Sequence, residues 1–180
     1  MKRLLSLLPV GLVAIALPVF AAVGVGDKAP DFTAQASLAG KEFTFNLADA
    51  LKKGPVVVYF YPEAFTKGCT IEAHEFAEAA DKYAALGASV IGVSHDKIDK
   101  LDKFSVQECR NKFAVAADPD LKVINMYGAA LPGHETYANR TSYVVAPDGK
   151  VIYMFSDLNP EQHVTNTLKA ISDWKAKNGK

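Results

Sequence analysis

Two apolar patterns of different period meet in the first half of the chain. Residues 55–61 (PVVVYFY) form a continuous β-branched and aromatic run without polar alternation. Such a run is typical of a strand that is buried on both faces of a parallel sheet. Further along, small and aromatic apolar residues recur every three or four positions from Ala73 to Ala84. The charged residues Glu72, Glu75 and Asp81 fall mainly between them, so the pattern predicts a helix with one apolar face, ending at Gly87.

The rest of the pattern continues as alternating strands and helices. We expect an N-terminal hairpin with strands at 32–34 and 43–45. After it the sequence predicts helices at 47–53, 97–113 and 121–127, strands at 89–94, 114–117, 141–146 and 150–155, a loop at 128–139, and a last helix from Asn159. This order indicates an α/β fold with a central mixed sheet flanked by helices on both faces.

The N-terminus has the composition of an export signal. Lys2 and Arg3 precede an uncharged, mostly apolar stretch from Leu4 to Phe20, and small residues surround Ala21. This three-part pattern predicts a signal peptide over residues 1–21, which leaves residues 22–180 as one domain. The stretch is short for a membrane span and contains Pro9 and Pro18, although an uncleaved anchor stays open as an alternative. We therefore expect a periplasmic protein that does not contact the membrane after cleavage.

Charge and composition exclude several functional classes. The 180 residues carry 20 basic and 20 acidic side chains, and loss of Lys2 and Arg3 leaves a net charge of −2. This balance does not favour nucleic acid or anionic membrane as a partner. The sequence has no glycine-rich phosphate loop, and its four histidines do not show metal-ligand spacing. We therefore expect neither a cofactor nor a metal.

Cys69 lies where an α/β sheet places its chemistry. It follows the apolar strand and falls in the first turn of the next helix, at the carboxyl end of the sheet. The free N–H groups and the positive end of the helix dipole stabilise an anion there, and Lys67 adds positive charge nearby. Because the thiolate is the nucleophilic form, Cys69 is a candidate reactive residue. The alternative is a small buried apolar residue, as most free cysteines are.

The spacing Pro62-x-x-x-Thr66-x-x-Cys69 favours the reactive interpretation. It resembles the active-site signature of the peroxiredoxins, and its context resembles the PrxQ, or bacterioferritin-comigratory, subfamily. The resemblance continues, in the expected order, through residues 26–32 (GDKAPDF), 90–96 (VIGVSHD) and 140–149 (RTSYVVAPDG). It implies a thioredoxin fold with an N-terminal β-hairpin extension, and a thiol-dependent peroxidase that reduces hydrogen peroxide and organic hydroperoxides.

The resemblance also implies a role for each matched residue. Cys69 would attack the peroxide and become a sulfenic acid, while Thr66 would accept a hydrogen bond from the peroxide. Arg140 would stabilise the thiolate and polarise the O–O bond, and Pro62 would shield the sulfur from water. Each matched residue other than Cys69 also has an ordinary structural alternative, with Thr66 as a helix cap, Pro62 as a strand terminator and Arg140 as a solvated charge.

The sulfenic acid must be removed before it oxidises further. Many PrxQ proteins carry a resolving cysteine five residues after the first, where this chain has His74. The other cysteine, Cys109, is our candidate, since some members resolve from the following helix. On a helix that begins near Lys97, however, Cys109 would lie about 18 Å from the sheet edge, so local unwinding would be needed. A buried structural thiol is the alternative.

Further expectations concern partners and rival functions. The resemblance implies a thioredoxin-like reductant or a low-molecular-weight thiol, and a monomer. If Cys109 is inert, the chain is a one-cysteine peroxidase that an external thiol resolves. An exported thiol–disulfide oxidoreductase of the same fold is the rival, but Cys-x-x-Cys would be expected there, and Thr70-Ile71-Glu72 follows Cys69 instead.

Overall fold

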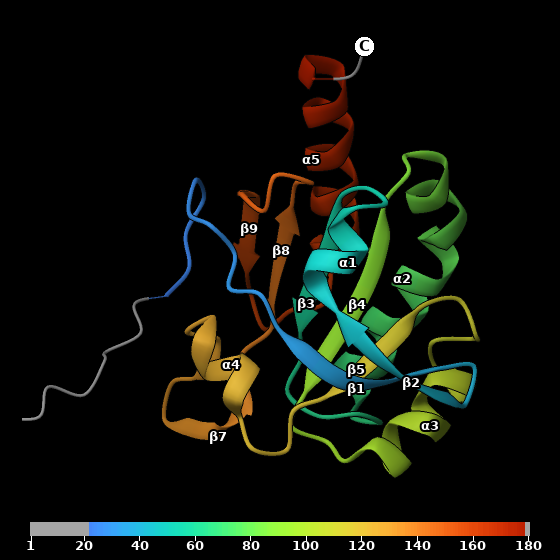
Figure 1. The fold of residues 1–180 in the computed structure, drawn as a ribbon. Coiled ribbons are helices and arrows are strands. Elements are labelled where there is room, and N and C mark those ends of the chain that lie inside the picture. Colours follow the sequence, from blue (N-terminus) through green and yellow to red (C-terminus); the bar gives the residue numbers. More distant parts are fainter. Residues whose placement is uncertain (1–21, 179–180) are drawn as a thin grey trace, which may run out of the picture.

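A mixed sheet forms the centre of the molecule (Figure 1). The computed structural model describes residues 22–178, so the predicted signal peptide lies outside them. Among these residues the main sheet has seven strands in the order β2-β1-β5-β4-β3-β8-β9. The strands are β1 (Thr33–Leu38), β2 (Lys41–Asn46), β3 (Val56–Phe60), β4 (Ser89–Ser94), β5 (Ala114–Ala117), β8 (Thr141–Val145) and β9 (Val151–Ser156). The helices are α1 (Leu47–Leu51), α2 (Lys67–Ala85), α3 (Ile98–Gln107), α4 (Lys122–Met126) and α5 (His163–Asn178).

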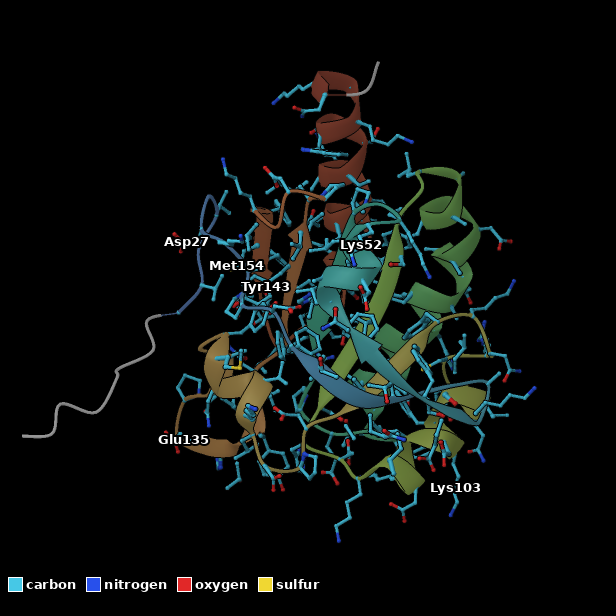
Figure 2. All side chains as sticks on the ribbon, viewed as in Figure 1. Asp27, Lys52, Lys103, Glu135, Tyr143 and Met154 are labelled. Atoms are coloured by element: carbon cyan, nitrogen blue, oxygen red, sulfur yellow. The ribbon has the colours of Figure 1, made fainter. Side chains whose placement is uncertain are left out.

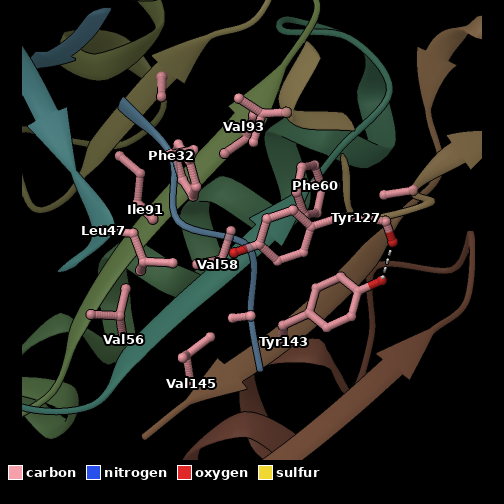
Figure 3. Packing of buried hydrophobic residues seen from close by; sticks show 14 of the residues in the cluster. Phe32, Leu47, Val56, Val58, Phe60, Ile91, Val93, Tyr127, Tyr143 and Val145 are labelled. Atoms are coloured by element: carbon pink, nitrogen blue, oxygen red, sulfur yellow. Dashed lines mark hydrogen bonds between the residues drawn. The ribbon is translucent and has the colours of Figure 1, made fainter. Parts of the chain in front are cut away.

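Strand β3 is buried on both faces, as its sequence predicts. All five of its residues are buried, and their side chains alternate between two apolar clusters. Val58 and Phe60 pack in the cluster that α1 and α4 cover, together with Tyr127 and Tyr143 (Figure 3). Val57 and Tyr59 pack in the cluster that α2, α3 and α5 cover. Helices therefore lie on both faces of the sheet, as predicted. Most charged side chains project outward instead, among them Lys103 and Glu135 (Figure 2).

The strand pairing brings distant segments to one edge of the sheet. β3 runs parallel to β4, and β4 parallel to β5. β8 runs antiparallel to β3, with Thr141 opposite Phe60. Since Arg140 directly precedes β8, it lies beside the point where the chain leaves β3 for the Cys69 helix. Register alone therefore explains how two positions 71 residues apart meet at the carboxyl end of β3.

The helix predicted at 97–113 is wrong in its second half. α3 ends at Gln107, and both Arg110 and Asn111 adopt left-handed backbone conformations, with φ of 51° and 60°. A right-handed helix cannot continue through such residues. The chain turns back on itself there, since the Asn111 amide donates to the Ser105 carbonyl at 3.0 Å. Cys109 therefore lies in an irregular segment after the helix.

Two other boundaries differ from the prediction. The expected loop at 128–139 contains a short hairpin of β6 (Ala130–Leu131) and β7 (His134–Ala138). The last helix begins at His163 rather than Asn159, because Gln162 has a φ of 77° and cannot be part of the helix. Within residues 22–178, no helix has both the length and the apolar character that crossing a membrane requires.

Candidate active site

The loop between β3 and α2 is fixed by the end of β4. Asp96, which is buried, accepts hydrogen bonds from the Ala64 amide at 2.7 Å and from the Ser94 hydroxyl at 2.8 Å. Lys100 pairs with Asp96 at 2.7 Å and with Glu63 at 2.8 Å. These charge-assisted contacts hold the loop in one conformation. They thereby position Pro62 and Thr66, which belong to this loop.

Pro62 and Thr66 lie in the loop that precedes the helix turn of Cys69. Pro62 is half-buried, and its carbonyl accepts a hydrogen bond from His95 Nδ1 at 3.0 Å. Thr66 is the N-cap residue of α2, yet its side chain does not cap the helix. Its hydroxyl donates to the Glu63 carbonyl at 2.9 Å and is exposed. Because the proton is engaged in that bond, the lone pairs of the Thr66 hydroxyl remain free to accept a hydrogen bond.

Cys69 and Arg140 are in contact at the start of α2. Arg140 Nη2 donates to Cys69 Sγ at 3.5 Å, and both side chains are buried. Arg140 Nε donates to the Leu158 carbonyl at 2.8 Å, which fixes the guanidinium plane. Gly68 lets the two groups approach, since a Cβ there would lie 3.0 Å from Nη2. A solvated Arg140, the structural alternative, is therefore wrong, since the buried guanidinium is directed at the sulfur.

Glu72 is the third member of this group. The apolar pattern of the helix had predicted that Glu72, as one of its charged residues, would lie outside the buried face. It is fully buried, and its Oε2 accepts a hydrogen bond from Arg140 Nη1. Burial raises the pKa of Glu72 to about 8, against the opposing attraction of Arg140. Burial also disfavours the charge of Arg140, but Glu72 and Cys69 outweigh it and raise the pKa of the guanidinium. The signal that could have revealed Glu72 is its position one turn after Cys69, on the same helix face.

His163 is a second residue that sequence reasoning did not select. It is buried at the start of α5, and its Nε2 lies 2.9 Å from the Asp157 carbonyl. A carbonyl only accepts, so Nε2 carries the proton and the neutral ring presents a lone pair at Nδ1. Nδ1 lies 2.8 Å from the Ser142 hydroxyl and 3.7 Å from Glu72 Oε1. Burial lowers the pKa of His163, which favours this neutral form.

Cys109 is a free thiol in the same apolar cluster as Cys69. It is fully buried, and burial together with nearby Glu108 raises its pKa well above the ordinary value. Its segment is fastened to α2 by a hydrogen bond between His74 and Glu108 at 2.7 Å. Two ion pairs add to it, Arg110–Glu78 at 3.0 Å and Lys112–Asp81 at 3.5 Å.

His74 marks where the segment of Cys109 meets α2. It is five residues after Cys69, or about 7.5 Å along the helix axis, and its side chain contacts Glu108, the residue before Cys109. Because α3 ends at Gln107, Cys109 does not lie on that helix as expected. The segment that carries Cys109 therefore packs on the same helix as Cys69, and both thiols are free.

Within residues 22–178, no three side chains of the metal-ligating types gather closely enough to hold a metal ion. The arrangement comprises a buried thiol with a fixed guanidinium against it, and an exposed hydroxyl with free lone pairs at the N-cap of the same helix. Such a site can stabilise a sulfur nucleophile and bind a small polar molecule with one acceptor and one cation.

Comparison with known proteins gives one consistent result. A model of the AhpC/TSA family matches residues 25–154. The chain is similar to peroxiredoxin Bcp of Escherichia coli strain K12, with 34% identity over 124 residues that cover 63% of this chain and 78% of that protein. It is also similar to the chloroplastic peroxiredoxin Q of Sedum lineare, with 32% identity over 87% of this chain and 82% of that protein. Among solved structures, peroxidoxin BcpB of Mycobacterium tuberculosis superposes with a TM-score of 0.76 at 30% identity, covering 84% of this chain and 97% of that one.

The raised pKa of Glu72 predicts how stability depends on pH. With a value near 4.5 in the unfolded chain and about 8 when folded, Glu72 binds more protons in the folded state between these limits. Its contribution to stability is therefore complete below pH 4.5 and is lost as pH rises towards 8, at up to about 1.4 kcal/mol per pH unit. Urea unfolding of the reduced protein at pH 5, 6, 7 and 8 should show Glu72→Gln gaining stability relative to wild type as pH rises.

Glu42→Gln is the control for this comparison. It removes one carboxylate from an exposed strand position. The difference in unfolding free energy between Glu42→Gln and wild type should therefore change little with pH. A difference between Glu72→Gln and wild type that is equally flat from pH 5 to 8 would contradict the raised pKa.

Proposed function

The chain belongs to the AhpC/TSA family of peroxiredoxins, and from this premise we propose that Cys69 is its peroxidatic cysteine. Membership makes the protein a thiol-dependent peroxidase, an oxidoreductase with an antioxidant activity. The observation that carries the assignment is the contact of Arg140 Nη2 with Cys69 Sγ in the first turn of α2. Cys109 follows α3 in a buried position and has no guanidinium against it in the described part of the chain.

The site geometry supports a direct displacement on the peroxide. The Cys69 thiolate attacks one peroxide oxygen, the O–O bond breaks, and negative charge develops on the departing oxygen. Arg140 is fixed by its bond to the Leu158 carbonyl, so its donors are already oriented when that charge appears. Thr66 accepts a hydrogen bond from the peroxide through its free lone pairs, and Pro62 limits the access of water. The sulfur becomes a sulfenic acid. Hydrogen peroxide and organic hydroperoxides are the substrates.

We assign the resolving role to Cys109. Its segment packs on α2 beside His74, the position that carries the resolving cysteine in many PrxQ proteins. Two features oppose reaction in the folded form, namely the complete burial of Cys109 and its raised pKa, which keeps the thiol protonated. The segment therefore has to open before Cys109 attacks the sulfenic sulfur and water leaves. A thioredoxin-like protein or a low-molecular-weight thiol then reduces the disulfide.

Export is a further part of the proposal. Residues 1–21 lie outside the described residues, so the proposal rests on their basic start, apolar middle and small residues near Ala21. Produced in a Gram-negative host, the full chain should yield a periplasmic protein whose first residue is Ala22, which N-terminal sequencing of that fraction determines. Full-length protein retained in the cytoplasm or held in the membrane would contradict export with cleavage.

The roles of the two cysteines are tested by oxidation with one equivalent of hydrogen peroxide. Wild type should lose two free thiols and form an intramolecular disulfide, identified by the mass of the linked peptides. Cys69→Ser should react at least about 10³-fold more slowly, at the rate of an ordinary buried thiol. Cys109→Ser should react as fast as wild type but accumulate a sulfenic acid that dimedone traps.

Each contrary outcome would support a different alternative to the proposed roles. A sulfenic acid of equal lifetime in wild type and Cys109→Ser would show that Cys109 is inert and that an external thiol resolves the enzyme. Rapid oxidation of Cys69→Ser would refute the assignment of Cys69. Reduction of protein disulfides without consumption of peroxide would favour the thiol–disulfide oxidoreductase.

The role of Thr66 is tested by a matched pair of substitutions. Thr66→Val keeps the shape but removes the acceptor, and loss of a hydrogen bond worth about 1.5–3 kcal/mol should lower kcat/KM for hydrogen peroxide by about tenfold to a hundredfold. Thr66→Ser keeps the hydroxyl and should stay within about threefold of wild type. Equal activities of the two variants would mean that Thr66 acts only at the start of the helix.

A further inference from the structure

Glu72 is placed to exchange charge with Cys69. The two residues are one turn apart on α2, and a single guanidinium bridges them, with Arg140 Nη1 on the carboxylate and Nη2 on the sulfur. All three side chains are buried. The other Glu72 oxygen, Oε1, has no hydrogen-bond partner among the described residues. The site therefore holds one fixed cation and two groups that can become its counterion.

Only one of those groups can be an anion at a time. Two negative charges against one guanidinium would leave a net charge in the protein interior, where each uncompensated ion costs several kcal/mol. His163 does not supply a second cation, since its buried ring is neutral. When Cys69 is a thiolate, the carboxyl group of Glu72 therefore keeps its proton. The pKa of about 8 that burial gives Glu72 agrees with this state at neutral pH.

The surroundings of Oε1 offer it no donor among the described residues. His163 Nε2 uses the ring proton on the Asp157 carbonyl, and Nδ1 lies 2.8 Å from the Ser142 hydroxyl and 3.7 Å from Oε1. A charged carboxylate oxygen that is buried without a donor is unfavourable, whereas a protonated oxygen in that position is neutral. The titratable and charged groups around Glu72 are Cys69, Glu75 and Tyr83 on α2, Tyr59 on β3, Arg140 before β8 and His163 on α5. Among them only Arg140 is a permanent cation.

We propose that Glu72 supplies the proton that peroxide reduction consumes, and that its carboxylate then replaces the Cys69 thiolate as the counterion of Arg140. The inference rests on the proposed function of Cys69. The sulfur donates an electron pair to one peroxide oxygen, the S–O bond forms and the O–O bond breaks. The departing alkoxide or hydroxide takes the Glu72 proton and leaves as alcohol or water. The products are a sulfenic acid, that alcohol or water, and a Glu72 carboxylate, so the net charge of the site is unchanged.

This exchange gives Arg140 a partner throughout the reaction. A sulfenic acid is neutral, so without Glu72 the buried guanidinium would lose its counterion at the moment the sulfur is oxidised. With the exchange, Arg140 Nη1 already donates to the oxygen group that becomes negative. The guanidinium does not need to move between the two states. The proton acceptor is the departing oxygen, whose basicity is far greater than that of a carboxylate.

The test follows one oxidation in the Cys109→Ser protein, where the reaction stops at the sulfenic acid. Infrared difference spectra before and after one equivalent of hydrogen peroxide at pH 7 should show loss of a carboxylic-acid carbonyl band and gain of a carboxylate band. An indicator dye in weak buffer should show uptake of almost no protons from solvent. With Glu72→Gln added, the band change should disappear and about one proton should be taken up per Cys69 oxidised.

Glu75→Gln, in the same background, is the matched control, because it makes the same substitution one turn further along α2. It should keep both the band change and the low proton uptake. Two results in the Cys109→Ser protein would overturn the inference: uptake of about one proton, or loss of an S–H band without loss of a carboxylic-acid band. If Cys69 is not oxidised at all, the proposed function fails instead, so the two failures are distinguishable.

Discussion

The contact of Arg140 with Cys69 depends on burying a cation at the edge of a sheet. A guanidinium placed there needs hydrogen-bond partners, and the structure supplies one for each of its three nitrogens: the Leu158 carbonyl, the Glu72 carboxyl group and the Cys69 sulfur. Because the carbonyl and the carboxyl group hold the plane in place, the contact with sulfur does not depend on a flexible side chain. The Cys69 sulfur is thus one of three hydrogen-bond acceptors around a fixed cation.

The topology explains why this contact forms. β3 ends at Phe60 and the chain enters α2 seven residues later, while antiparallel β8 begins opposite Phe60 with Arg140 immediately before it. The loop between β3 and α2 would otherwise be free to adopt other conformations. Asp96 and Lys100, from the end of the neighbouring strand and the start of α3, hold it through hydrogen bonds and ion pairs. Three adjacent strands therefore contribute to one small site.

Some parts of this site could be predicted from local sequence and others could not. The strand at 55–61 and the helix start at Cys69 are local features, and the structure has the strand at Val56–Phe60 and the helix from Lys67. The motif with Pro62 and Thr66 is local too, and the roles of these two residues stay a prediction. Glu72 and His163 were missed because their burial comes from tertiary contacts between α2 and α5, and a charged residue is ordinarily exposed. The end of α3 was missed because left-handed Arg110 and Asn111 leave no mark in the apolar period.

The segment after α3 links redox chemistry to local stability. Cys109 is held inside the apolar core by a hydrogen bond and two ion pairs between its segment and α2, and the segment contains two residues in strained backbone conformations. If this thiol resolves the enzyme, the lifetime of the sulfenic acid equals the waiting time for that segment to detach. Oxidation to the sulfinic acid then competes with a motion of the chain rather than with a chemical step. The balance between repair and damage then depends on the contacts that hold this segment to α2, and not on the sulfur alone.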